Sequence, residues 1–211
     1  FFGNSYTISR LLPGQYMVSL QRDNFSLWKK KVVVEEGLVD DYSRIMLLPE
    51  SGEAKENIKT EIKDLFYPIL KKTPTPTVIS STKPKPSSAP LKSPISTPFS
   101  TDPFYVKNGV LFKNMENGET ERLAYLVAGF VVSPDGKKIA WWNSNELWIM
   151  WISDTDYQPF HKAGDKNLIT RFSIKIKNVS WFRGSDHVVV DSNGYKIVEI
   201  DKRGWLNIIE I

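Results

Sequence analysis

Two histidines and no cysteine limit the chemistry that this chain of 211 residues can perform. A serine-hydrolase triad needs one histidine that is held by an acid and faces an exposed serine. His161 and His187 lie far apart in the sequence, and no Gly-x-Ser-x-Gly motif presents such a serine. The lack of cysteine excludes disulfides, thiolate metal sites and cysteine nucleophiles. We therefore predict that both histidines are structural and that the chain is not an enzyme and uses no cofactor.

Two short segments have the oxygen-bearing side chains of a calcium site. Asp154 and Asp156 are separated by one residue, and Asp191-Ser192-Asn193-Gly194 combines carboxylate, hydroxyl and amide groups. The second segment lacks the spacing and the terminal glutamate of a calcium loop, and its Asn-Gly pair is typical of a β-hairpin turn. The sequence also has no glycine-rich phosphate loop. It therefore predicts no metal site.

Tryptophan is the residue type in this chain that is best suited to binding. Alternation along a strand sends Trp141 and Trp142 to opposite faces of a sheet, and most of the indoles should pack between sheets. Aromatic side chains are also favoured at contact hot spots. We predict Trp142 and Trp151 as candidate contacts to a peptide or glycan ligand. Six of the 7 tryptophans lie in the C-terminal half, at positions 141, 142, 148, 151, 181 and 205.

The net charge of +4 and the pI of about 9.1 would suit a nucleic-acid partner. The excess lies in one segment, residues 71–100, which contains five lysines, no acid and seven of the 13 prolines. Without that segment, 23 basic residues face 24 acidic ones. We therefore expect no nucleic-acid partner. The sequence also has no run of about 18 apolar residues that would predict a transmembrane helix.

The N-terminal part alternates between apolar and polar residues with the period of β-strands. Pro13-Gly14 and Glu35-Glu36-Gly37 mark turns between the strands. We predict a small β module over residues 1–49, with short strands at residues 6–8, 15–20, 30–34 and 42–48.

The period changes to that of a helix over residues 50–72, with Ser51 at the N-cap. We expect this amphipathic helix to pack on a neighbouring domain. An oligomerising or membrane-surface helix is the alternative, although its polar face mixes charge signs. Residues 73–103 are rich in Pro, Ser and Thr and predict a disordered, extended spacer. A ligand for proline-binding modules is the alternative there.

Residues 104–211 return to strands and contain an internal repeat. The stretch 130–142 is strand, turn and strand, and two further strands follow it. The pattern restarts at Val179, so that Val188 aligns with Ile139. Four antiparallel strands per repeat match a β-propeller blade. We predict about two such blades, with part of another at residues 104–113, and hence a mainly β fold.

The N-terminal module resembles a known family in three places. Leu12-Pro13-Gly14-Gln15-Tyr16, Asn24-Phe25-Ser26-Leu27-Trp28 and Leu47-Leu48-Pro49 resemble the Pro-Gly-Glu-(Tyr) turn, the Gly-Tyr-x-x-Trp stretch and the closing Leu-x-Pro of the PEGA domain. Gln15 replaces the usual Glu, and Asn24-Phe25 replaces Gly-Tyr. The family's N-terminal strand is missing, so that the resemblance covers residues 5–49. It implies a small β-sandwich module.

The C-terminal repeat has a resemblance of its own. Ser133-Pro134-Asp135-Gly136-Lys137-Lys138-Ile139-Ala140, followed by Glu146-Leu147-Trp148-Ile149, resembles the blade signature of TolB-like (WD40-like) propellers. A second copy at residues 181–184 keeps the aromatic residue but loses Pro-Asp-Gly. The turn should join two inner strands, and Ile139 and Trp141 should face a neighbouring blade.

This order of PEGA module, low-complexity linker and propeller is similar to predicted bacterial envelope proteins. It implies a non-enzymatic, extracytoplasmic binding or scaffold protein whose propeller binds a protein or a cell-wall glycan. It also implies a membrane anchor, which we expect upstream of Phe1. The alternative is the non-catalytic propeller portion of a larger envelope enzyme such as a peptidase. Because a propeller needs four or more blades, we expect a longer gene product or a partner to supply the others.

Overall fold

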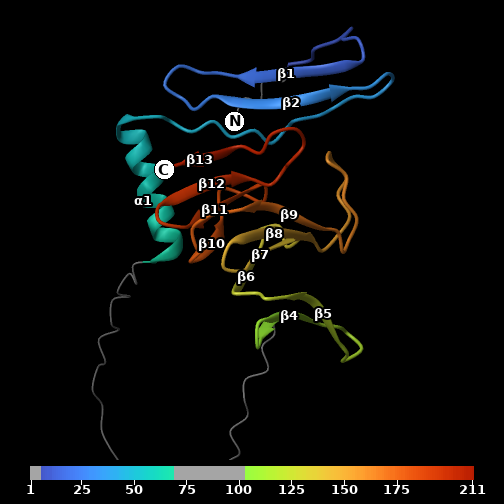
Figure 1. The fold of residues 1–211 in the computed structure, drawn as a ribbon, viewed down its shortest axis with the longest axis vertical. Helices are drawn as coiled ribbons and strands as arrows, with labels where there is room; N and C mark the ends of the chain where they lie inside the picture. Colours follow the sequence, from blue (N-terminus) through green and yellow to red (C-terminus); the bar gives the residue numbers. More distant parts are fainter. Residues whose placement is uncertain (1–5, 69–102) are drawn as a thin grey trace, which may run out of the picture.

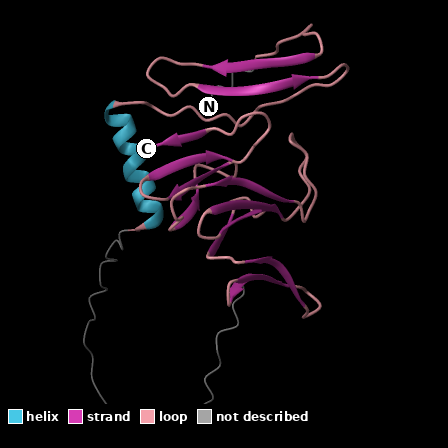
Figure 2. Cartoon of the chain, in the orientation of Figure 1, coloured by secondary structure: helices cyan, strands magenta, loops and turns pink. Residues whose placement is uncertain are grey.

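The computed structural model describes residues 6–68 and 103–211. Within these ranges the chain is mainly β, with four separate antiparallel sheets and a single helix (Figure 1). Figure 2 shows the helix along one side of the strands. The predicted fold class is therefore confirmed at the level of a mainly β protein with one helix. The predicted linker, residues 73–103, lies outside the described residues except for Pro103.

The N-terminal part forms a two-stranded sheet. Strand β1 (Gly14–Leu20) pairs with β2 (Trp28–Val34) along their full lengths. The strands predicted at residues 6–8 and 42–48 are wrong, because both segments are irregular. An isolated bridge joins Phe25 to Pro49, which directly follows the second segment. The alternation at 42–48 has another cause: Met46 and Leu48 pack onto the core of a distant sheet.

The predicted helix is present but shorter than expected. Helix α1 (Gly52–Phe66) follows Ser51, which occupies the N-cap position without a side-chain capping hydrogen bond. Ile58 and Ile62, one turn apart, are buried against the C-terminal part of the chain. The expectation that the helix docks on a neighbouring part of the protein is therefore confirmed.

The C-terminal part folds into three sheets in chain order. Each is a meander in which consecutive strands pair with one another. The first sheet has three strands, and the second and third have four each. Their bounds are β3 (Phe104–Lys107), β4 (Val110–Asn114), β5 (Thr120–Tyr125); β6 (Gly129–Val132), β7 (Lys138–Trp142), β8 (Glu146–Trp151), β9 (Lys166–Arg171); and β10 (Asn178–Trp181), β11 (His187–Asp191), β12 (Tyr195–Glu199), β13 (Ile208–Glu210).

The predicted repeat corresponds to the second and third sheets. Ile139 lies in β7 and Val188 in β11, each the second strand of its sheet. The Pro134-Asp135-Gly136 turn joins β6 to β7, and the Gly136 N–H donates to the Ser133 carbonyl over 2.8 Å. The fragment predicted at residues 104–113 belongs to the three-stranded first sheet.

The layers pack face to face, because each sheet covers a face of the next. Trp141 lies in the core between the first and second sheets, and Trp142 in the core between the second and third. The prediction that these two indoles occupy opposite faces is confirmed. A third core lies between the third sheet and α1, and it contains Leu48, Ile58, Ile62, Phe182, Val189 and Ile197.

This order leaves the two ends of the stack unlike each other. Helix α1 covers the outer face of the third sheet, so that no further sheet can pack there while the helix is in place. No described element covers the outer face of the first sheet. Figure 1 shows β4 and β5 at the end of the stack farthest from β1 and β2.

Candidate functional site

Two places in the structure have the composition of a functional site. The first is a pocket where the segment after β2, the loop between β8 and β9 and the segment after β12 meet. We call it the junction pocket. Its cavity of about 30 Å³ has room for water but not for an organic ligand. It is lined by Tyr42, Ser43, Arg44, Ile45, Lys138, Trp151, Tyr157, Gln158, Pro159, His161, Asp186, Glu199, Ile200, Asp201 and Arg203.

A stacked pair occupies one side of the junction pocket. The His161 ring lies on the Trp151 indole with centroids 3.6 Å apart, and its Nδ1 is 3.6 Å from Asp165 Oδ2. Burial lowers the pKa of His161 more than the charge of Asp165 raises it. The imidazole is therefore neutral near pH 7.

Lys138 supplies a buried cation at the edge of the same pocket. Its Nζ lies 3.4 Å from Asp135 Oδ2 and 3.5 Å from Asp186 Oδ1. Burial alone would raise the pKa of Asp135, but hydrogen bonds from Ser133 Oγ and the Lys137 N–H, with the charge of Lys138, lower it to about 2. The positive charge of Lys138 is therefore balanced by the carboxylates of Asp135 and Asp186.

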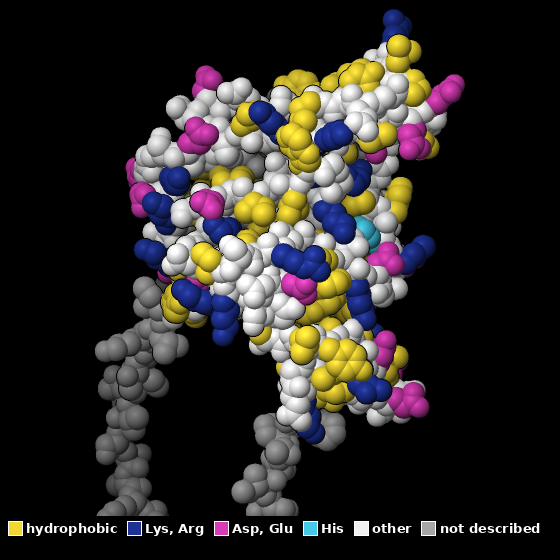
Figure 3. Space-filling model, in the orientation of Figure 1, with side chains coloured by type: hydrophobic (Ala, Val, Ile, Leu, Met, Phe, Trp, Pro, Cys, Tyr) yellow, Lys and Arg dark blue, Asp and Glu magenta, His cyan; other side chains and the backbone are white. Residues whose placement is uncertain are grey.

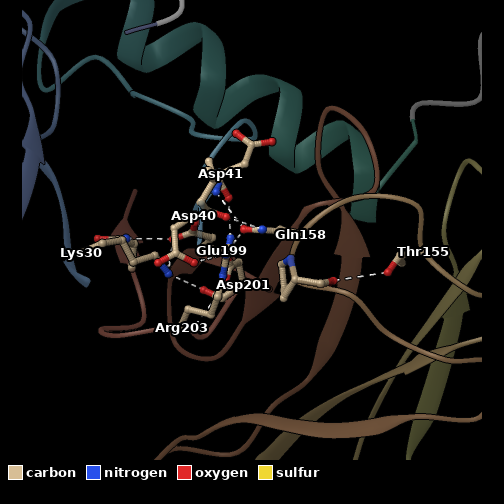
Figure 4. Close-up of polar contacts among 11 residues, drawn as sticks. Lys30, Asp40, Asp41, Thr155, Gln158, Glu199, Asp201 and Arg203 are labelled. Carbon is tan, nitrogen blue, oxygen red and sulfur yellow. Dashed lines mark hydrogen bonds and ion pairs between the residues drawn. The ribbon is translucent and has the colours of Figure 1, made fainter. Parts of the chain in front are cut away.

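Arg203 fastens the segment after β2 to the end of the third sheet (Figure 4). Its guanidinium donates to the Asp201 carboxylate over 2.7 Å, to the Asp41 carbonyl over 2.8 Å and to Gln158 Oε1 over 3.1 Å. It also lies 4.2 Å from the centroid of the Tyr42 ring. All three nitrogens of this guanidinium donate to groups of the chain itself.

Beside the pocket, Lys30 of β2 is buried against the third sheet. Lys30 is 0% exposed and Glu199 5% exposed, with 3.2 Å between Nζ and Oε2. Lys30 also donates to the Asp201 carbonyl, and Asn207 Nδ2 donates to Glu199 over 2.8 Å. Burial raises the pKa of Glu199 more than Asn207 and Lys30 lower it. The pair holds the N-terminal hairpin on the sheet.

The charged groups of the junction pocket thus satisfy one another. Arg44 completes the set, since its Nε lies 3.2 Å from Asp186 Oδ2 and its guanidinium covers the Tyr157 ring. Within the described ranges, no group of three or more His, Asp or Glu side chains is placed to hold a metal ion. The arrangement positions three chain segments relative to one another.

The two predicted ligand contacts are buried. Trp142 is 6% exposed, and its ring lies against Gly129 in the core. Trp151 is 2% exposed and borders the junction pocket beneath His161. A ligand role for either residue stays a prediction, and Trp151 lines the junction pocket.

Sequence reasoning missed Lys30, Glu199 and Arg203. One signal for Lys30 was available: Trp28 and Val32 are inward-facing positions of β2, and alternation places Lys30 on the same face. The partners of Lys30, Glu199 and Asp201, lie far along the chain, and no local sequence pattern predicts them.

A wider hollow of about 300 Å³ lies between the start of α1 and β13. Glu210 in its lining is paired with Lys196. The rest of the lining is Ser26, Pro49, Glu50, Lys55, Ile209 and Ile211. It contains no aromatic side chain and no histidine. The hollow has no cluster that would do chemistry.

The second candidate site is the outer face of the first sheet. The strand register places Tyr105 opposite Phe112, and Phe112 opposite Arg122. Phe104, Leu111 and Leu123 point the other way, into the core. We call the outer surface the open face and define it by the side chains of Tyr105, Lys107, Val110, Phe112, Arg122 and Tyr125.

Aromatic side chains dominate the open face. Tyr105 and Phe112 stack with ring centroids 5.3 Å apart and planes 18° apart, and Tyr125 is 64% exposed. Figure 3 shows hydrophobic side chains gathered on the lobe that β4 and β5 form. Exposed aromatic groups of this kind are typical of contact surfaces.

The buried ion pair gives the first prediction. Lys30→Met keeps the aliphatic stem but leaves Glu199 buried without its partner, so the free energy of unfolding should fall by about 3–5 kcal/mol. Chemical denaturation measures the loss. Lys30→Met combined with Glu199→Leu should recover most of it, and Lys29→Met, at an exposed neighbouring position, should change stability by less than about 0.5 kcal/mol. A Lys30→Met variant as stable as the parent chain contradicts the role of the pair.

His187 gives the second prediction, a dependence of stability on pH. It pairs with Glu199 across β11 and β12 and is 8% exposed. Burial, and then the charge of Lys30, lower the pKa of His187 to about 4. The unfolded chain, with a histidine pKa of about 6.5, binds this proton more tightly than the folded chain. Stability from neutral His187 is therefore complete above about pH 6.5 and is lost as the pH falls toward 4.

The size of this loss is about 3 kcal/mol. Denaturation curves recorded at several pH values should show a steeper loss for the parent chain than for His187→Gln, which does not titrate. Parallel profiles for the two proteins would show that His187 is not held in its neutral form.

Comparison with known proteins leaves the PEGA-like and TolB-like resemblances as predictions. Within the described ranges, no helix has the length and apolar character needed to cross a bilayer. The sequence matches no model of a protein family, and no curated protein matches it.

Proposed function

We propose that the chain is a non-enzymatic binding or scaffold protein of the bacterial cell envelope, with the open face as its interaction surface. The observation that carries the proposal is the difference between the two ends of the stack. Helix α1 closes the end at the third sheet, while the end at the first sheet presents Tyr105, Phe112 and Tyr125 outward.

The composition of the sheet faces supports a ligand surface rather than a contact for another sheet. The face of the second sheet that contacts the first is apolar, with Ile139, Trp141 and Met150. The open face, although it is the corresponding face of the first sheet, carries Lys107 and Arg122 among its aromatic groups. Cations at such positions would be desolvated by a covering sheet, at considerable cost.

The finer assignment belongs to the same proposal. The three sheets are TolB-like blades, and the hairpin β1-β2 is the core of a PEGA-like module. The meander order and the position of β10 beside β6 support blades, and the residue patterns support both families. An extracytoplasmic location and an upstream membrane anchor follow from these resemblances alone.

Co-sedimentation with isolated bacterial envelope fractions tests the function. The parent chain should sediment with the envelope, and Phe112→Ser combined with Tyr125→Ser should weaken the affinity about tenfold, since two aromatic contacts are lost. The control is Met17→Ser combined with Val33→Ser, a pair of exposed apolar residues on the hairpin, which should sediment like the parent. Far-ultraviolet circular dichroism confirms that each variant folds.

Failure of the parent chain to sediment with any envelope fraction would contradict the proposal. So would equal sedimentation of the parent and a folded Tyr125→Ser variant, because that residue is the most exposed aromatic group of the open face.

A further inference from the structure

We propose that the ligand of the open face is an acidic oligosaccharide, such as a chain of uronic acids. This inference rests on the proposed function and names the class of ligand.

The charge of the open face is positive and uncompensated. Lys107 and Arg122 are exposed, and within residues 6–68 and 103–211 neither side chain lies in an ion pair. Glu121 occupies a register position opposite Lys113, on the other face of the sheet. Glu116 and Glu119 lie outside the strands, in the connection between β4 and β5. A ligand that covers the open face must therefore bring negative charge.

The aromatic groups favour sugar rings as the neutral part of that ligand. The faces of an aromatic ring carry negative partial charge, and the C–H groups on one side of a pyranose ring carry the complementary positive charge. Tyr105 and Phe112 form a single stacked platform, and Tyr125 stands one register row away, opposite Val110. The cations then lie at the borders of the platform, where sugar carboxylates would project.

The size of the open face argues against a folded protein as the occupant. Three strands spaced about 4.8 Å apart and two rows of outward side chains give a surface of roughly 200 Å². A stable protein complex buries about 800 Å² on each partner. A short oligosaccharide covers the available surface, whereas a folded protein would need contacts beyond it.

Two other occupants fit less well. A second copy of the chain would bring Lys107 and Arg122 close to their own equivalents, and like charges at an interface are repulsive. A single-stranded nucleic acid needs a positively charged groove that follows its backbone. The open face carries only two cations, Lys107 and Arg122, which do not form such a continuous groove.

Isothermal titration calorimetry of the full chain with oligogalacturonate tests the inference. We expect binding that weakens with added salt, and at least about tenfold weaker binding of a neutral malto-oligosaccharide and of oligothymidylate. Lys107→Gln combined with Arg122→Gln should lower the affinity for oligogalacturonate about tenfold. The matched control is Lys29→Gln combined with Lys31→Gln, two exposed strand lysines on the hairpin, which should leave the affinity unchanged. Because these substitutions replace exposed charged side chains, the test does not depend on whether the aromatic variants fold.

Three results would overturn the inference. The first is no heat of binding with oligogalacturonate, and the second is tighter binding of oligothymidylate. The third is an equal loss of affinity in the Lys107→Gln, Arg122→Gln variant and in the Lys29→Gln, Lys31→Gln control. If the envelope still retains the parent chain and releases Tyr125→Ser, the proposed function stands and only the acidic glycan is wrong. If Tyr125→Ser is retained like the parent, the proposed function itself fails.

Discussion

A lysine ammonium that is withdrawn from water must meet negative charge nearby, and Lys30 meets Glu199. The arrangement of the N-terminal third depends on this pair. A two-stranded hairpin is only marginally stable on its own. The position of β1-β2 is fixed by Lys30 and by the hydrogen bonds of Arg203 to the segment that follows β2. That segment leads directly into α1, so that the position of the helix depends on the same anchoring.

The anchored helix determines which surface the protein presents. A stack of sheets has two outer faces, and an apolar outer face is either covered by another element or serves as an interaction surface. Ile58 and Ile62 cover one of them. The other bears stacked aromatic rings together with Lys107 and Arg122, which form no ion pair within residues 6–68 and 103–211, and we propose that it binds a ligand. The N-terminal part, which residues 69–102 separate in sequence from the other three sheets, therefore acts as the cap of the stack.

Features that depend on local pattern could be predicted from the sequence. The helical spacing of Ile58 and Ile62 and the Pro134-Asp135-Gly136 turn are set by neighbouring residues, and both appear in the structure. The strand predicted at residues 42–48 failed because Leu48 alternates with its neighbours for another reason: it packs on the third sheet. The site was harder to predict. Trp142 is a candidate contact by its residue type but lies in the core, whereas Lys107 and Arg122 become neighbours of the aromatic groups only through strand register.

Thiol labelling tests the central claim, a stack capped at one end and open at the other, most directly, because the chain contains no cysteine of its own. Tyr125→Cys places a thiol on the open face, and Val189→Cys places one beneath α1. Under native conditions the Tyr125→Cys variant should react at the rate of an exposed thiol. The Val189→Cys variant should react at least about a hundredfold more slowly, since labelling there requires the cap to open. Similar labelling rates for the two variants would show that α1 does not close the third sheet and would contradict the account.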